Sequence, residues 1–149
     1  GLATPQGAVK CVDLGVEGVS VSNHGGRQLD QGLGSCAVLP EIVDAVDKKS
    51  LIVVDGSICR GTDILKAIAL GADAVGMGRM QGYGLAAAGS AGVVRMLEIL
   101  EDECSKALGL MGVNGFADLD QSCLTPAPVV NDPHALSAFP LLAVDANPY

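Results

Sequence analysis

Apolar residues follow two alternating patterns along the chain: short runs that are apolar almost throughout, and longer stretches at helical spacing. The short runs cover 16–22, 50–54 and 72–76, and each is followed by a glycine-containing turn. Such short, continuous apolar runs are typical of strands buried on both faces. The chain is therefore predicted to contain three buried strands.

The longer stretches predict helices before, between and after the strands. In the first, Thr4 is a suitable N-cap with Pro5 at the first helical position, and Gly15 ends the helix. A glycine- and serine-containing loop at 31–36 precedes the second helix, which is expected over 39–46. Strands alternating with helices predict an α/β fold in which helices cover a parallel sheet, although periodicity alone leaves a closed barrel and an open sheet equally possible.

Two further helices complete this part of the chain. Thr62 or Asp63 is expected to cap the third, and Gly71 to close it. The fourth is expected over about 85–110. Its predicted apolar face consists of Val93, Val94, Met96, Leu97, Leu100 and Leu108. We therefore expect one domain over 1–120.

The remaining segment, 121–149, has a different composition. It contains five of the seven prolines and shows no strong periodicity. Such a segment is expected to be a tail rather than a second domain. His134 lies there without a partner motif and is predicted to be a surface residue.

Composition narrows the class of protein further. Hydrophobic residues make up 49% of the chain, aromatic residues 3%, and there is no Trp. The core is therefore expected to be aliphatic. The longest uncharged apolar run, 80–94, is shorter than the roughly 18 residues of a membrane span and contains five Gly or Ser residues.

Charge argues against nucleic acid as a partner. The formal net charge is −8, and such a surface repels phosphate backbones. Three arginines, Arg27, Arg60 and Arg79, nevertheless lie in glycine-containing turns that could hold a small anion. The five cysteines are scattered without metal-ligand spacing, which predicts neither a disulfide framework nor a zinc site. A cytoplasmic location is expected.

A His–Arg pair follows the first predicted strand, in the sequence Ser22-Asn-His-Gly-Gly-Arg-Gln-Leu-Asp30. The paired glycines allow a tight turn and close ligand approach. Imidazole accepts a proton near neutral pH, and guanidinium binds a carboxylate through two parallel hydrogen bonds. The pair therefore suits proton abstraction from a small anionic substrate. A solvated loop would show the same residue types.

Two further turns follow the second and third strands. Residues 55–61 (DGSICRG) and 76–79 (GMGR) combine glycine with arginine. Backbone amides in such turns bind phosphate, and barrels often place a phosphate site after their last two strands. An ordinary strand-to-helix loop with a surface arginine remains the alternative for each.

Together these segments resemble a known family. SNHGGRQLD, DGSICRGTDILKAIALGADAV and GMGR, in this order, are similar to signatures of the FMN-dependent 2-hydroxy-acid oxidases and dehydrogenases. The resemblance covers about 1–120. It implies a (β/α)8 TIM barrel of which this chain is a C-terminal portion, with the N-terminal half as its partner. It also implies FMN as cofactor, and oxidation of an L-2-hydroxy acid of the lactate, glycolate or mandelate type to the 2-keto acid.

The resemblance also implies residue roles. His24 is the expected base, and Arg27 is expected to bind the substrate carboxylate; no metal is expected. The residues expected to contact FMN are Ser22, Asp55, Gly56, Ser57, Ile58, Cys59, Gly78 and Arg79. We expect the full-length protein to be a homo-oligomer, either cytoplasmic or peripheral to a membrane.

The chain departs from the family at two positions. The family usually reads Asp-Gly-Gly-aliphatic-Arg-Arg-Gly, whereas here Ser57 replaces the second glycine and Cys59 the first arginine. Ser57 is expected to need a negative φ, and Cys59 removes a cation near the phosphate. Two alternatives therefore stay open: a non-catalytic fragment that binds FMN or another phosphate ligand, and another phosphate-binding barrel enzyme such as an isomerase. Phosphate-ligand binding without reduction by any hydroxy acid would favour the first.

Overall fold

The computed structural model describes residues 1–28 and 31–127. The elements are α1 (Pro5–Asp13), β1 (Gly18–Val21), α2 (Ser35–Val46), β2 (Leu51–Asp55), α3 (Gly61–Ala69), β3 (Ala74–Gly76) and α4 (Arg79–Met111), with short 3-10 turns η1 (His24–Gly26), η2 (Phe116–Asp118) and η3 (Gln121–Cys123). The expectations for Leu29, Asp30, His134 and most of the tail lie outside the described residues.

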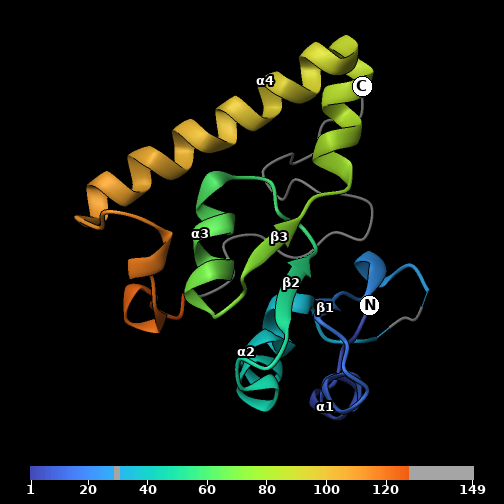
Figure 1. The fold of residues 1–149 in the computed structure, drawn as a ribbon. Coiled ribbons are helices and arrows are strands. Elements are labelled where there is room, and N and C mark those ends of the chain that lie inside the picture. Colours follow the sequence, from blue (N-terminus) through green and yellow to red (C-terminus); the bar gives the residue numbers. More distant parts are fainter. Residues whose placement is uncertain (29–30, 128–149) are drawn as a thin grey trace.

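The three strands form one parallel sheet in the order β1-β2-β3 (Figure 1). Residue Leu2 adds a parallel bridge to Val21 at the outer edge of β1. Because all strands run the same way, their carboxyl ends meet at one edge of the sheet. The predicted parallel sheet with helical cover is confirmed.

The core lies between one face of this sheet and its helices. Burial alternates along β1 and β2, so that Val19, Val21, Ile52 and Val54 are buried among apolar residues of the helices. The intervening positions are more open, and Leu51 is 61% exposed. The strands are thus covered on one face, whereas their nearly continuous apolar runs predicted burial on both.

The start of α1 was predicted correctly. Thr4 is its N-cap, and the Thr4 Oγ1 accepts a hydrogen bond from the amide of Gly7 at 3.2 Å. The prediction for α2 was wrong by four residues, because the helix begins at Ser35 and contains Pro40 in its interior. The apolar period becomes visible only near Leu39, which explains why the first turn was interpreted as a loop.

The predicted cap of α3 was also wrong. Arg60 is the N-cap, and the Asp63 carboxylate lies in the first turn, where its Oδ2 accepts from the amides of Cys59 at 3.2 Å and Arg60 at 3.0 Å. Asp63 therefore fixes the backbone of the two residues that precede α3, as an acidic residue near a helix N-terminus commonly does.

Helix α4 begins six residues earlier than predicted and is broken at Ala88 and Gly89 (Figure 1). Its second segment packs against α3, and the buried residues of α4, Met96, Leu100 and Cys104, recur at intervals of four. Val94 and Leu97, predicted to be buried, are about half exposed (54% and 51%) because only one side of the helix meets α3.

By length and composition, α4 is the one helix in the described part of the chain that could cross a membrane. Only 11% of its most apolar window is buried. The break at Ala88 and Gly89 lies inside the uncharged stretch, so a straight span would require the two segments to realign. The helix is therefore weak evidence for a membrane location.

Candidate active site

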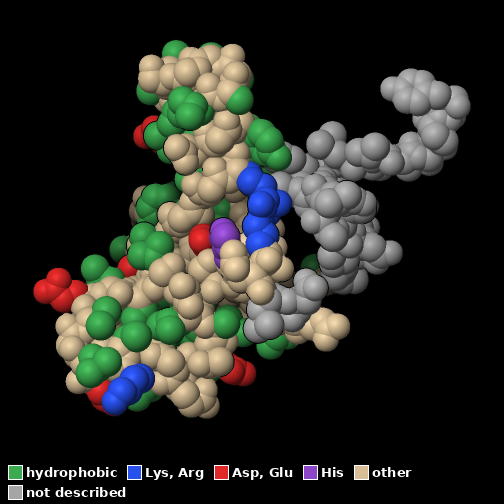
Figure 2. Space-filling model, turned by 90° about the vertical axis from the view of Figure 1, so that its right-hand side faces the viewer, with side chains coloured by type: hydrophobic (Ala, Val, Ile, Leu, Met, Phe, Trp, Pro, Cys, Tyr) green, Lys and Arg blue, Asp and Glu red, His purple; other side chains and the backbone are tan. Residues whose placement is uncertain are grey.

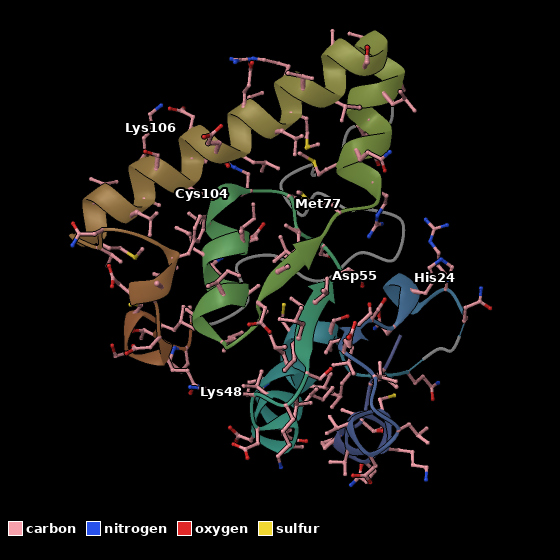
Figure 3. The ribbon with its side chains drawn as sticks, viewed as in Figure 1. His24, Lys48, Asp55, Met77, Cys104 and Lys106 are labelled. Carbon is pink, nitrogen blue, oxygen red and sulfur yellow. The ribbon has the colours of Figure 1, made fainter. Side chains whose placement is uncertain are left out.

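The carboxyl ends of the three strands open into one cleft of about 300 Å³. Figure 3 shows His24, Asp55 and Met77 at the ends of successive strands. The lining residues are His24, Gly25, Arg27, Asp55, Gly56, Ser57, Ile58, Cys59, Gly76, Met77, Gly78, Arg79 and Met80. The cleft thus contains every predicted site residue except Ser22.

His24 lies in the tight turn η1, directly after β1. Its φ is +56°, a left-handed conformation that few side-chain-bearing residues adopt, and Gly25 and Gly26 follow with φ of +64° and +73°. Ser22 Oγ accepts a hydrogen bond from the His24 amide at 3.2 Å. This bond and the two glycines hold the turn that presents the exposed imidazole to the cleft.

Two guanidinium groups share this cleft with the imidazole. Arg27 ends η1 and is exposed, whereas Arg79 begins α4 and is half-buried. A guanidinium nitrogen of Arg79 lies 3.8 Å from the point where a Cβ on Gly25 would stand, so Arg79 reaches the histidine turn. Figure 2 shows the histidine beside basic side chains on this face. The cleft therefore suits an anionic ligand.

The loop after β2 forms the floor of the cleft. Gly56 and Ser57 have consecutive φ values of +112° and +57°. The expectation of a negative φ at Ser57 was wrong: the serine keeps the left-handed conformation that glycine adopts without strain. Ile58 is 6% exposed, and its side chain belongs to the core, so only its backbone is available to a ligand.

Arg60 does not point to the cleft. Its Nε donates to Glu103 Oε1 on α4 at 2.8 Å, and a terminal nitrogen pairs with the same oxygen at 2.8 Å. Glu103 Oε2 also accepts from the Gly61 amide at 2.7 Å. The suggestion that Arg60 adds charge to an anion site was therefore wrong, and this arginine fixes α3 against α4 instead.

Cys59 occupies the position of the missing arginine and lines the cleft. Burial raises the pKa of its thiol, the nearby Asp63 carboxylate raises it further, and Arg79 opposes them. The thiol is therefore neutral near pH 7 and contributes no charge to bind an anion. Among the described residues lining the cleft, the permanent positive charges are those of Arg27 and Arg79.

Two buried oxygens have no hydrogen-bond partner within the described chain. Asp55 Oδ1 belongs to a cleft residue, and Ser35 Oγ lies 3.2 Å from the point where a Cβ on Gly56 would stand. A carboxylate oxygen without a donor suits a ligand that carries hydroxyl groups. Gly78 has open space around its missing Cβ, which leaves room beside Arg79 for an anionic end. These residues therefore fit a ligand that carries both hydroxyl groups and an anionic end.

Two residues of this region were not identified from the sequence. Gln28 lies four residues after His24, and its side-chain amide nitrogen is 3.4 Å from His24 Nδ1. Its position within the histidine motif was the available signal. Glu103, the partner of Arg60, is 43 residues away along the chain, so no local pattern indicated it.

The chain is similar to proteins of one family throughout the described region. A model of the FMN-dependent dehydrogenase family matches residues 1–126. An L-lactate oxidase of Nostoc sp. is 45% identical over 124 residues, which are 83% of this chain and 34% of that protein. An L-lactate dehydrogenase of Caulobacter vibrioides is 42% identical and covers 83% of this chain and 32% of its own length.

Solved structures agree with the sequence comparison. A mandelate oxidase crystal structure aligns with a TM-score of 0.76 at 46% identity, covering 78% of this chain and 34% of that one. A mandelate oxidase mutant solved with a monooxide FMN adduct aligns equally well. The chain spans about a third of the length of these relatives. It belongs to the FMN-dependent dehydrogenase family and forms part of its α/β barrel.

Proposed function

We propose that this chain carries the proton-accepting and phosphate-binding part of an enzyme that oxidises a small L-2-hydroxy acid to the 2-keto acid. The observation that carries the proposal is a single cleft holding His24 and Arg27 together with the two phosphate-type loops. The family match over 1–126 supports it, as do relatives named for lactate and mandelate.

FMN is the cofactor proposed for this cleft. Asp55 would accept from its hydroxyl groups through the unpartnered Oδ1, while the backbone of 56–59 and the Gly78–Arg79 turn would bind its phosphate. Ser22, whose hydroxyl holds the His24 turn, would approach the flavin from beside the cleft. When bound, the flavin supplies the acceptor for two electrons, and the protein supplies position and charge.

Arg27 and His24 would have different roles toward the substrate. The Arg27 guanidinium would bind the substrate carboxylate through paired charge-assisted hydrogen bonds and so fix the position of C2. The His24 imidazole would then take a proton from the substrate as the C2 hydroxyl becomes a ketone. Nearby positive charge from Arg79 would stabilise negative charge that develops during the reaction.

The test requires a complete barrel. Residues 1–126 would replace the matching segment of the Nostoc L-lactate oxidase. The chimera is expected to bind FMN and to lose its yellow colour when mixed anaerobically with L-lactate, glycolate or L-mandelate. His24→Gln should abolish bleaching while FMN stays bound. Lys48→Gln, at the far end of the sheet from the cleft (Figure 3), is the control and should bleach normally.

A second candidate is a module that binds FMN or a related phosphate ligand without turnover. The left-handed Ser57 and the neutral Cys59 favour it, because both weaken the phosphate end of the cleft. An FMN-loaded chimera that none of the three acids bleaches would support this candidate. Bleaching that survives His24→Gln would remove the histidine from the proposed role.

A further inference from the structure

We propose that Glu103 is a positioning residue that sets the preference of the cleft for FMN over riboflavin, the same flavin without its phosphate. Glu103 lies outside the cleft lining, on the second segment of α4, and 23% of its side chain is exposed. Its carboxylate binds the chain at the start of α3, directly after the loop that would meet the phosphate. The inference rests on the proposed function, since it concerns how that loop keeps its shape.

Both oxygens of the Glu103 carboxylate have partners at the start of α3. Oε1 accepts from Nε of Arg60 and pairs with a terminal nitrogen of the same side chain, each at 2.8 Å, and Oε2 accepts from the Gly61 amide at 2.7 Å. The next residue of α4, Cys104, places its sulfur 3.4 Å from the Gly61 carbonyl oxygen. Burial raises the pKa of this thiol and Glu103 raises it further, so the thiol keeps its proton and donates it. These contacts fix the start of α3 on α4 (Figure 3).

The backbones of the two helices also approach closely at this point. A Cβ on Gly61 would stand 2.6 Å from the Glu103 Cβ and 2.7 Å from the backbone nitrogen of Cys104. Only a residue without a Cβ allows α3 to lie so near α4. A steric fit is thus combined with charge-assisted hydrogen bonds, and together they leave the start of α3 little room to shift.

The loop before α3 lies between two fixed ends. It leaves β2 at Asp55 and reaches the N-cap of α3 at Arg60, and within it Gly56 and Ser57 have φ values of +112° and +57°. A side-chain-bearing residue keeps such a strained backbone only when its surroundings impose it. Glu103 holds the α3 end of the loop. Without its carboxylate the loop would relax, and its amides would turn from the directions that a phosphate requires.

The direction of the backbone amides matters because the loop itself offers a phosphate little charge. The Cys59 thiol is neutral, and the cation that acts on it, Arg79, belongs to the neighbouring turn. A phosphate therefore depends on amides that point inward together, as in other anion-binding turns. Riboflavin lacks the phosphate and would be bound through its ring and its hydroxyl groups, with Asp55 as one acceptor. Loss of Glu103 is thus expected to weaken binding of FMN and not of riboflavin.

The test compares the affinities of the chimera for FMN and riboflavin, measured by quenching of flavin fluorescence. Glu103→Ala should weaken FMN binding about tenfold, the change that one lost hydrogen bond to a charged group would cause if it lowers the population of the binding-competent loop. Riboflavin binding should stay within about twofold of the parent. At saturating FMN, bleaching by L-lactate should also stay within about threefold, because His24 and Arg27 lie on a different turn.

Two further variants accompany this one. Glu103→Gln has a single oxygen for the Arg60 and Gly61 donors and should weaken FMN binding less, by about threefold, again without affecting riboflavin. Asp102→Ala is the matched control. Asp102 precedes Glu103 on α4, but its carboxylate pairs with Lys106 of the same helix. Its loss removes one charge and one ion pair from the same turn, and the preference for FMN should remain that of the parent.

The outcomes distinguish this inference from the proposed function. A parent chimera that binds FMN no more tightly than riboflavin would refute the phosphate site itself. If the parent prefers FMN, equal weakening of both flavins in Glu103→Ala would mean that the carboxylate only supports the fold, and the inference would be wrong. Should Glu103→Ala bind neither flavin, Glu103→Gln decides by the same comparison: a preference for FMN equal to that of the parent would overturn the inference.

Discussion

The left-handed backbone of Ser57 lies in the loop that should meet a phosphate. A residue with a Cβ is strained by about 1–2 kcal/mol at the positive φ of this position. Glycine would avoid the strain, but it loses more conformational entropy on folding, so only part of that energy would be gained as stability. Ser57→Gly is therefore expected to stabilise the chimera by about 0.5–1 kcal/mol. Urea unfolding would measure this. Ser105→Gly, in the ordinary helix of α4, should cost about 0.5 kcal/mol, and equal losses at both positions would contradict the strain.

Cys59 sets the charge at the same loop. Burial and Asp63 raise the pKa of its thiol, so it offers an incoming phosphate no cation at neutral pH. Cys59→Arg is expected to tighten FMN binding to the chimera about tenfold, as one added charge-assisted hydrogen bond would. Flavin fluorescence quenching measures the affinity, and the gain should shrink with added salt. Cys123→Arg, exposed on η3 and outside the cleft lining, is the control and should change affinity little.

At the residue scale, spacing along the sequence predicted a side chain's place correctly only where all the interacting residues lie in one turn. His24 and Arg27 are three residues apart, and both line the cleft as expected. Arg60 was misjudged because its partner, Glu103, lies on another helix. Ser57 was misjudged because sequence gives no φ value, and the loop kept the shape that glycine favours.

The break in α4 depends on two glycines that touch. A Cβ built on Gly92 would stand 2.0 Å from the carbonyl oxygen of Gly84, because the two segments of the helix fold toward each other. Gly92→Ala is expected to destabilise the chimera by about 1–3 kcal/mol through this overlap. Gly109→Ala lies in the same helix with nothing within 4 Å and should stabilise it by about 0.5–1 kcal/mol. A stabilising effect at both sites, by thermal unfolding, would show that the contact is absent.

At the element scale, periodicity predicted all three strands and four helices but not where the helices begin. The apolar period describes the face that packs, and the first turns of α2 and α4 precede that face. The break at Gly89 was missed because glycines recur at 82, 84, 89 and 92, and the sequence does not indicate at which of them the helix breaks.

The whole molecule presents a sheet that is covered on one face and open at its edges. Among the described strands, β3 pairs only with β2, and at the other edge Leu2 adds one bridge. Large apolar side chains remain exposed around the body, including Leu14 at 69% and Leu110 at 90%. Parallel strands are normally buried on both faces, so in a barrel the remaining strands would cover the open face of this sheet, on which Leu51 is exposed.

This geometry predicts how the 149-residue chain behaves by itself. With the 124 matched residues making up 34% of the Nostoc enzyme, most of a closed barrel is missing around the sheet. Exposed strand edges pair with other chains. We expect the chain alone to elute from gel filtration well above its 15.0 kDa mass, whereas the chimera elutes as one defined species. A monodisperse, FMN-loaded monomer of the chain alone would contradict this, and would mean that one covered face is enough to hold both the sheet and its cofactor.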